Sequence, residues 1–161
     1  MEMNKRVITQ IKGSAGEYAV ASELLFRYYV VQPMSIDAGI DLVCWKGTKR
    51  YDIQVKTAIE SEKTRKTKTL IYDVRKKTFD VLSKVNSFYV FVARMLDGTN
   101  KFILFPSHVL KKLIEEDKLY LMRGDVYRVS LKFDPDGTVY LKGKRTQEDV
   151  SYYLNKWDLI S

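Results

Sequence analysis

Three polar side chains in the first half of the chain have the types and spacing to do chemistry together: Asp41, Gln54 and Lys56. Residues 40–45 and 51–56 alternate as two strands do, and the intervening KGTK favours a two-residue turn with glycine first. Counting outward from this turn places Asp41 opposite Gln54, with Cβ atoms about 5 Å apart, and Lys56 on the same face about 7 Å along. We therefore expect a carboxylate, an amide oxygen and an ammonium group in one small patch. A solvated hairpin face would alternate in the same way, so that simpler interpretation stays open.

A second acid, Glu17, lies in a segment with helical periodicity. Ser14 and Glu17 have the spacing of a capping box, and apolar residues follow at helical intervals, which predicts a helix over residues 14–29. Glu17 occupies the first position of the apolar stripe rather than the wet face. Burial of a charge is costly unless the charge is paired, so this acid needs a partner. Either Glu17 only caps the backbone at Ser14, or it faces Asp41 across a cation.

Two acids, an amide oxygen and a lysine in one place describe a divalent-metal site. Mg²⁺ prefers oxygen ligands, uses one or two carboxylates and keeps several waters, so such a site can hold the ion beside a substrate phosphate. The chain has one cysteine, Cys44, and one histidine, His108. That count excludes a disulfide framework, a Cys/His zinc finger and any mechanism that requires two histidines.

The charge balance favours a polyanionic partner, with nucleic acid first among them. The chain has 28 Lys and Arg against 20 Asp and Glu, a net charge of +8. Residues 61–85 hold eight of these cations against three acids, so this stretch contributes five of the eight excess charges. Residues 63–68 lack apolar side chains and periodicity, which predicts an exposed loop, although a plain solvated surface run is the simpler alternative. The residues expected to contact phosphates are Lys12, Lys63, Arg65, Lys66 and Lys68.

The remaining pattern predicts one soluble α/β domain that carries these residues on a mixed sheet. The run at 88–95 is nearly all apolar, which indicates a central strand buried on both faces. No stretch is apolar enough to span a membrane and no secretory signal is present, so we expect a cytoplasmic protein. The expected helices cover 14–29, 76–84, a segment from 107 and a segment from about 146; the expected strands cover 30–34, 40–45, 51–56, 70–74, 88–95, 102–105, 126–133 and 138–142.

The motifs, in their order, resemble the PD-(D/E)xK nuclease superfamily, and most closely its archaeal Holliday-junction-resolvase-like branch. The residues that carry this resemblance are Gly13-Ser14-x-x-Glu17, Gly39-Ile40-Asp41-Leu42-Val43 and Gln54-Val55-Lys56. The resemblance implies a restriction-endonuclease-like αβββαβ core with a mixed central sheet over about residues 13–95. Residues 96–161 would then be additions, a C-terminal β-hairpin and helix, within a single nuclease-like domain of residues 1–161.

The resemblance also implies roles for individual residues. In that family the acid of the second strand bridges the metal, which is Asp41 here, and the first helix supplies a glutamate, which is Glu17. Gln54 stands where the third strand carries an acidic ligand, and Lys56 matches the lysine that assists the attacking water. Two departures follow: Ile40 replaces the proline before the first acid, and Gln54 removes one negative charge, which should weaken Mg²⁺ binding.

The function implied is a DNA endonuclease that hydrolyses phosphodiester bonds with Mg²⁺ or Mn²⁺, and that works as a homodimer or higher homo-oligomer, as many such enzymes do. A first alternative is a catalytically inactive DNA-binding module on the same fold, which Gln54 favours. A second alternative is a basic RNA- or protein-binding domain without a metal, which would require Glu17 to be only a helix cap.

Overall fold

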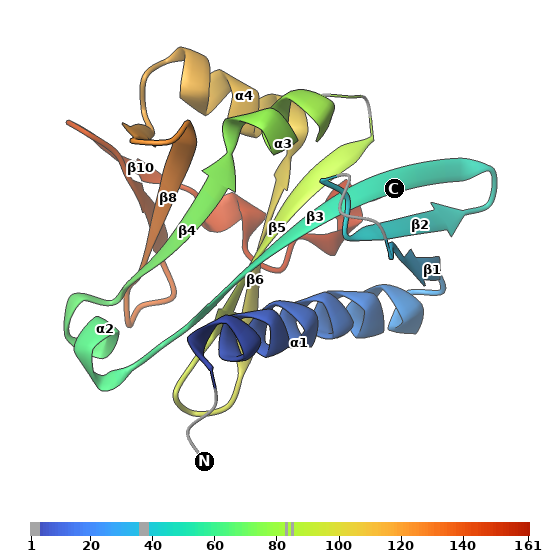
Figure 1. The fold of residues 1–161 in the computed structure, drawn as a ribbon, viewed down its shortest axis with the longest axis horizontal. Helices are drawn as coiled ribbons and strands as arrows, with labels where there is room; N and C mark the ends of the chain where they lie inside the picture. Colours follow the sequence, from blue (N-terminus) through green and yellow to red (C-terminus); the bar gives the residue numbers. More distant parts are fainter. Residues whose placement is uncertain (1–3, 36–38, 83, 85) are drawn as a thin grey trace.

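The computed structural model describes residues 4–35, 39–82, 84 and 86–161, and Figure 1 draws its helices and strands. The helices are α1 (Lys5–Phe26), α2 (Glu62–Thr67), α3 (Lys76–Leu82) and α4 (Ser107–Glu115), with 3₁₀ turns at Ser151–Tyr153 and Trp157–Leu159. The strands are β1 (Val30–Pro33), β2 (Leu42–Lys46), β3 (Lys49–Ile59), β4 (Thr69–Arg75), β5 (Ser87–Arg94), β6 (Asn100–Pro106), β7 (Tyr120–Met122), β8 (Val126–Phe133), β9 (Val139–Lys142) and β10 (Gln147–Asp149). In this part of the chain, no helix is both long and apolar enough to cross a membrane.

The strands form two sheets, where the sequence predicted one. The first sheet has the order β1-β2-β3-β5-β6 and is mixed, because β3 and β5 are parallel while their outer neighbours are antiparallel. The second has the order β10-β9-β8-β4, with β7 also paired to β8. The predicted strand at 70–74 is therefore real but belongs to the second sheet, because β4 pairs along its length with β8.

Two apolar cores hold the layers together on opposite faces of the first sheet. Helix α1 covers one face, and the second sheet with α3 and α4 covers the other (Figure 1). β5 contributes to both cores and is buried along seven of its eight residues, which confirms the predicted central strand. β3 separates α1 from β4, so its side chains face the helix on one side and the second sheet on the other.

The hairpin of β2 and β3 has the register that the turn predicted. Lys46 pairs with Lys49 and Val43 with Asp52, across a turn in which Gly47 has a φ of +61°. That positive φ is readily available to glycine, as the first position of this turn requires. The apolar face of the hairpin is buried in the α1 core, as expected.

Helix α1 begins at Lys5, nine residues before the predicted start at Ser14. The side chain of Asn4 caps it by accepting a hydrogen bond from the backbone N–H of Arg6 at 2.9 Å. The first turns are largely exposed, and their apolar residues Val7, Ile8 and Ile11 do not belong to the buried stripe from which the start was predicted. Ser14 lies in the helix interior, and the predicted capping box between Ser14 and Glu17 is wrong.

Gly16 allows α1 to approach β3 closely. A Cβ atom at Gly16 would lie 1.8 Å from Thr57 Oγ1 and 3.0 Å from Thr57 Cβ, so rotation of the threonine would not remove the clash. A Cβ atom at Gly13, one turn earlier, would meet nothing within 4 Å. The glycine next to Glu17 thus sets the depth at which this part of the helix sits on the sheet.

We expect Gly16→Ala to lower the free energy of unfolding by about 1–3 kcal/mol, because the helix must move away from Thr57. The matched change Gly13→Ala should raise it by about 0.5–1 kcal/mol, since alanine is the better helix former and has free space. Urea denaturation of both variants measures the difference. Equal stabilisation by the two changes would show that α1 does not depend on this close contact.

The C-terminal segment lacks the predicted helix from about residue 146. Asp149 instead accepts a hydrogen bond from the backbone N–H of Ser151 at 2.9 Å, and the Ser151 hydroxyl accepts one from Val139 N–H at 2.9 Å. Such local side-chain bonds compete with helix formation, and Asn155 then adopts a left-handed φ of 51°. Trp157 packs against Phe102 with ring centroids 5.1 Å apart, so the aromatic residues are core without being helical.

Candidate active site

Asp41 lies just before β2 and is held by backbone contacts on both sides. Its N–H donates to the carbonyl of Ile53 at 2.9 Å, and its own carbonyl accepts from Met34 N–H at 2.8 Å. Its Oδ2 accepts a hydrogen bond from the backbone N–H of Val55 at 2.7 Å and another from the side-chain Nε2 of Gln54. The carboxylate is thereby fixed at the edge of the hairpin.

Gln54 is the buried partner of Asp41, with an exposed fraction of 4%. Its Nε2 donates to the Asp41 carboxylate, whereas its Oε1 is buried without a hydrogen-bond partner among the described residues. Buried polar atoms are nearly always paired, so this oxygen marks a place where a ligand or a rotated amide would be more favourable. A flip of the Gln54 side-chain amide by about 180° would point Oε1 toward the Asp41 carboxylate. That orientation is favourable only when a cation lies between the two oxygens.

Glu17 reaches the same region from α1. Burial raises the pKa of its carboxyl first, the negative charge of Asp41 raises it further, and the positive charge of Lys56 lowers it. The structure therefore places Glu17 within electrostatic range of both Asp41 and Lys56. Since Ser14 is inside the helix, the interpretation of Glu17 as a cap is removed.

A hollow of about 490 Å³ opens beside Gln54 and Lys56, between β3 and the second sheet. Asp73 and Arg75 of β4 and Thr78 of α3 line its other wall. Arg128 of β8 lies across from Asp73, with Nε 3.1 Å from the carboxylate oxygen Oδ1.

Asp73 and Arg75 were not among the site residues predicted from the sequence. The alternation along β4 exposes residues 71, 73 and 75 on one face, which is a signal for a wet strand face. That signal does not say which strand lies opposite, because β4 and β3 face each other only through the tertiary packing of the two sheets.

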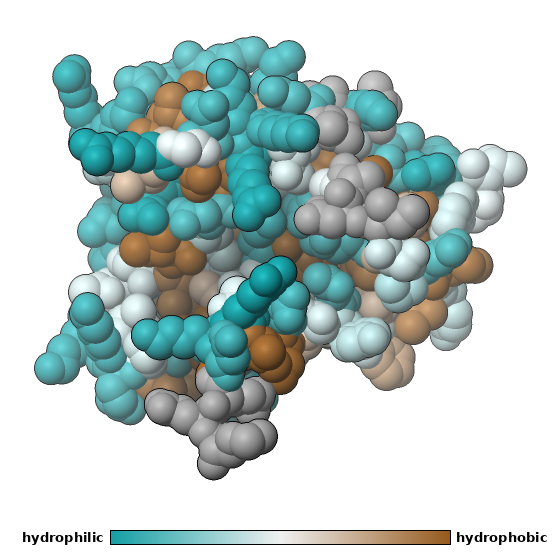
Figure 2. Space-filling view, in the orientation of Figure 1, coloured by the Kyte–Doolittle hydropathy of each residue, from teal (hydrophilic) through white to brown (hydrophobic). Residues whose placement is uncertain are grey.

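The basic residues at 63–68 lie on an exposed helix, α2, and not in the predicted loop. Ser61 and Thr64 form a capping box in which each side chain binds the backbone N–H of the other, and this starts the helix. Lys68 then ends it in the left-handed conformation, with φ 53°. Space-filling Figure 2 shows mostly hydrophilic side chains over α2.

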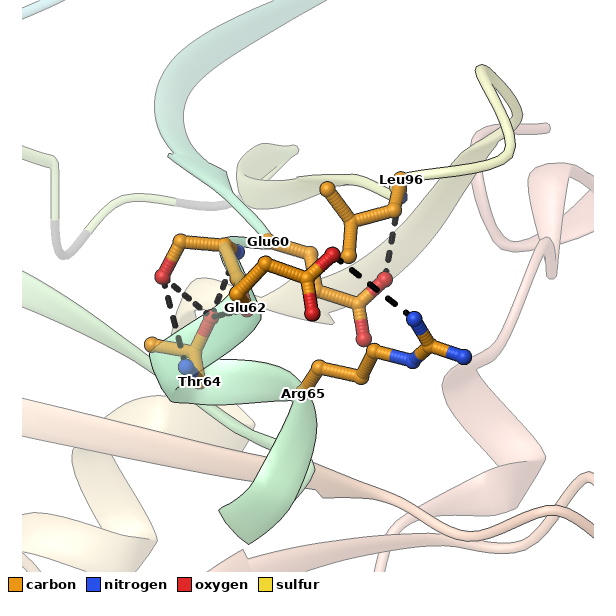
Figure 3. Close-up of polar contacts among 6 residues, drawn as sticks. Glu60, Glu62, Thr64, Arg65 and Leu96 are labelled. Carbon is orange, nitrogen blue, oxygen red and sulfur yellow. Dashed lines mark hydrogen bonds and ion pairs between the residues drawn. The ribbon is translucent and has the colours of Figure 1, made fainter.

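The predicted phosphate contacts do not all face the hollow. Figure 3 shows Arg65 turned toward Glu62, with an N–O distance of 3.7 Å, while Glu60 accepts from Leu96 N–H at 3.0 Å. Arg65 also lines a depression with Lys101 on that side of α2. Lys12 of α1 lines a third hollow with Thr57, one turn of helix before Gly16. The structure thus places Gln54 and Lys56 at one hollow with Asp41 hydrogen-bonded to Gln54, and Glu17 within electrostatic range of Asp41 and Lys56. Among the predicted phosphate contacts, Arg65 and Lys12 line other depressions, and none of the five lines that hollow.

The sequence profile of the PD-(D/E)XK endonuclease family matches residues 7–133, about four fifths of the chain. The chain belongs to this family. No curated protein matches it. The family assignment confirms the resemblance carried by the short motifs, and it extends well beyond the segment in which those motifs lie.

Solved structures show the fold that accompanies this PD-(D/E)XK membership. The bacterial homing endonuclease I-Ssp6803I is 23% identical, with a TM-score of 0.57, over 94% of this chain and 90% of that one. The Holliday junction resolvase Hjc of Archaeoglobus fulgidus is 14% identical, with a TM-score of 0.48, over 73% of this chain and 83% of that one. The similarity to the homing endonuclease shows a shared restriction-endonuclease-like fold, as the sequence predicted.

The residues at the site of this PD-(D/E)XK protein fit a hard divalent cation. Glu17 and Asp41 are carboxylates that repel each other, and Gln54 Oε1 is a buried oxygen that finds no donor among the residues that the structure describes. Among the described residues there is no group of three or more His, Cys, Asp or Glu side chains that could hold a metal. Two carboxylates and an amide oxygen suit Mg²⁺, which keeps waters for its remaining positions, better than they suit zinc.

The raised pKa of Glu17 predicts a pH-dependent stability. A carboxyl whose pKa is raised above its ordinary value of 4.5 stabilises the fold fully below that value, and the contribution is lost as pH rises through the folded-state pKa. Glu17→Gln removes this loss. In the absence of divalent ions we expect the stability of the variant relative to the wild type to increase as the pH rises above 4.5 and through the folded-state pKa of Glu17, and to stay higher beyond it.

Denaturation at a series of pH values measures that gain. Glu23→Gln on the same helix is the matched control, because Glu23 forms an ion pair with Arg27. A gain of equal size in the control, or none in Glu17→Gln, would contradict the placement of Glu17 beside Asp41.

Proposed function

We propose that this chain is a Mg²⁺-dependent DNA endonuclease, with Mn²⁺ able to replace Mg²⁺. The observation that carries the proposal is the Asp41 carboxylate, which is fixed by Val55 N–H and lies within range of Glu17 and Lys56. Beside it is the Gln54 Oε1 atom, which has no hydrogen-bond partner in the described part of the chain. Membership of the PD-(D/E)XK family supports the nuclease class.

In this proposal Asp41 is the central ligand, and Glu17 and the Gln54 amide oxygen complete the protein's share of the coordination. When bound, the ion lowers the pKa of its water and offsets negative charge on the reacting phosphate. Lys56 orients the attacking water and stabilises the added negative charge at the phosphorus. Arg75, on the opposite wall of the hollow, is placed to hold a phosphate oxygen of the strand.

The basic helix α2 and Lys12 supply affinity for the DNA backbone without reading its sequence. Such contacts release counterions, so binding should weaken steeply as salt is raised. Cleavage of both strands of a duplex would then require a homodimer or higher homo-oligomer, in which each copy contributes one site.

Nicking of supercoiled plasmid and of branched DNA tests the proposal. The purified chain should convert both substrates in Mg²⁺ and neither in EDTA, and Mn²⁺ should restore the reaction. Salt-dependent DNA binding without cleavage in either metal would instead support an inactive DNA-binding module. Absence of both binding and cleavage would reject the nuclease proposal and the binding module together.

Gln54 is the specific observation that favours the inactive module, because its Nε2 occupies the Asp41 oxygen that a cation would use. We expect Gln54→Glu to increase Mg²⁺ affinity roughly tenfold, since a third carboxylate adds charge to the site. Cleavage measured over a range of Mg²⁺ concentrations detects the shift. The control is Asp52→Asn, which changes the charge of a residue on the same strand, β3, but outside the site.

An unchanged Mg²⁺ dependence in Gln54→Glu would show that position 54 is not a ligand. Cleavage that begins only in Gln54→Glu would show that the natural chain is the inactive module with an otherwise complete site.

A further inference from the structure

A second cavity lies away from Asp41, at the N-terminal end of α4. Its volume is about 510 Å³, and it is bounded by the beginning of β5, the end of β6 and residue Tyr51 of β3. Tyr51 precedes Gln54 by three residues, which is about 10 Å along a strand. The cavity is therefore separate from the hollow beside Lys56.

Three hydroxyl groups in the walls of this cavity lack partners. They belong to Tyr51, Ser87 and Ser107, whose exposed fractions are 2%, 3% and 2%. Within the described part of the chain none of the three hydroxyl oxygens has a hydrogen-bond partner. Buried hydroxyls without partners are unusual, and three around one cavity indicate that a polar group completes them.

The charge around the cavity indicates that the polar group bound there is negatively charged. α4 is nine residues long, and among the described residues no side chain caps its first turn, where Pro106 holds the cap position. The free N–H groups and the helix dipole favour an anion there. His108 and Lys111 on α4 and Lys84 before β5 add donors and positive charge.

The other walls are apolar. Phe88 and Leu159 line the cavity beside the hydroxyls. Burial raises the pKa of the Tyr51 phenol, so this group stays protonated at neutral pH and can donate a hydrogen bond. The volume exceeds what a phosphate group alone would fill, and the apolar side offers space for a sugar or a base.

We propose that this cavity binds a nucleoside phosphate, with the phosphate at the α4 N-terminus and the hydroxyls of Tyr51, Ser87 and Ser107, and the nucleoside against Phe88. The phosphate belongs either to a strand of bound DNA or to a free nucleotide. The cavity needs neither the ion nor the acids of the candidate active site, so it binds its ligand whether or not the chain cleaves DNA.

Titration with inorganic phosphate and with deoxyadenosine 5′-monophosphate, followed by the amide NMR signals of residues 107–109, tests the proposal. Lys111→Gln should weaken binding of both ligands roughly tenfold, by loss of a charge-assisted contact. Lys112→Gln is the matched control, because it makes the same charge change one residue away and breaks an equivalent ion pair, Lys112 with Glu116 as Lys111 with Glu115, while only Lys111 lines the cavity. The control should bind as the wild type does.

Ser107→Ala provides a second variant that keeps the charge. It should weaken phosphate binding and leave the melting temperature unchanged or higher, because it removes an unpaired buried hydroxyl. Equal binding by the wild type, Lys111→Gln and Ser107→Ala would overturn the proposal, as would absence of amide shifts with millimolar phosphate and nucleotide.

DNA binding by the same variants separates the two sources. Weaker duplex binding by Lys111→Gln, with competition from the nucleotide, assigns the site to a DNA phosphate. Unchanged duplex binding with lost nucleotide binding assigns it to a free nucleotide. Both results support the site, and neither depends on cleavage.

Discussion

Asp41→Asn should reduce Mg²⁺-dependent cleavage by at least about 100-fold, the largest effect we expect from one substitution. The asparagine keeps one oxygen for the backbone N–H of Val55, so the hairpin is retained. It loses the charge that, in the proposed function, would hold the cation. The loss should appear in the rate at saturating DNA, because the change lies away from α2.

The pKa of Glu17 gives a second measurement for this prediction that does not depend on cleavage. Because Asp41 raises the pKa of Glu17, Asp41→Asn should move the pKa of Glu17 back toward its ordinary value, which carboxyl NMR titration can follow. Asp52→Asn is the matched control: Asp52 is on the same hairpin, and its Oδ1 lies 2.9 Å from Arg50 Nε. Equal loss of cleavage in both variants would mean that the hairpin, and not the site, had been damaged.

Lys56→Met should reduce cleavage roughly 100-fold while DNA binding changes little. The methionine keeps most of the side chain's length and packing but not its ammonium group. Since Lys56 lowers the pKa of Glu17, its removal should also raise that pKa further.

Lys49→Met gives the control for this second prediction, because Lys49 is an exposed lysine at the other end of the same strand. It should cleave as the wild type does, with only a small increase in salt sensitivity. If Lys56→Met cleaved normally, the water-orienting role would have to pass to another residue, and Arg75 is the cation on the facing wall.

The hairpin register was predictable because it depends only on the turn. A two-residue turn fixes every pair outward from Lys46 and Lys49, and the structure agrees with that count. The position of Glu17 on the inner stripe of α1 also follows from local periodicity. The start of α1 does not, since Asn4 caps a first segment that makes few core contacts.

The second sheet could not be predicted from local sequence patterns. Its strand β4 pairs with β8, about 55 residues later, so no nearby pattern specifies the partner. Asp73 and Arg75 reach the hollow only through that pairing. The helix predicted near the C-terminus was wrong for a related reason: Asp149 and Ser151 make bonds to nearby backbone that an apolar periodicity does not reveal.

The parallel pairing of β3 with β5 implies an order in which a newly synthesised chain assembles. The hairpin of β2 and β3 is local and forms early, but an isolated hairpin is only marginally stable in water. β5 can pair with β3 only after residues 60–86, which include β4 and α3, have emerged and docked. Such long-range closure is slow. A partly made chain that ends before β5 therefore carries Asp41 and Lys56 without a lasting arrangement, and the candidate site takes its shape only after residues 87–94 have been synthesised.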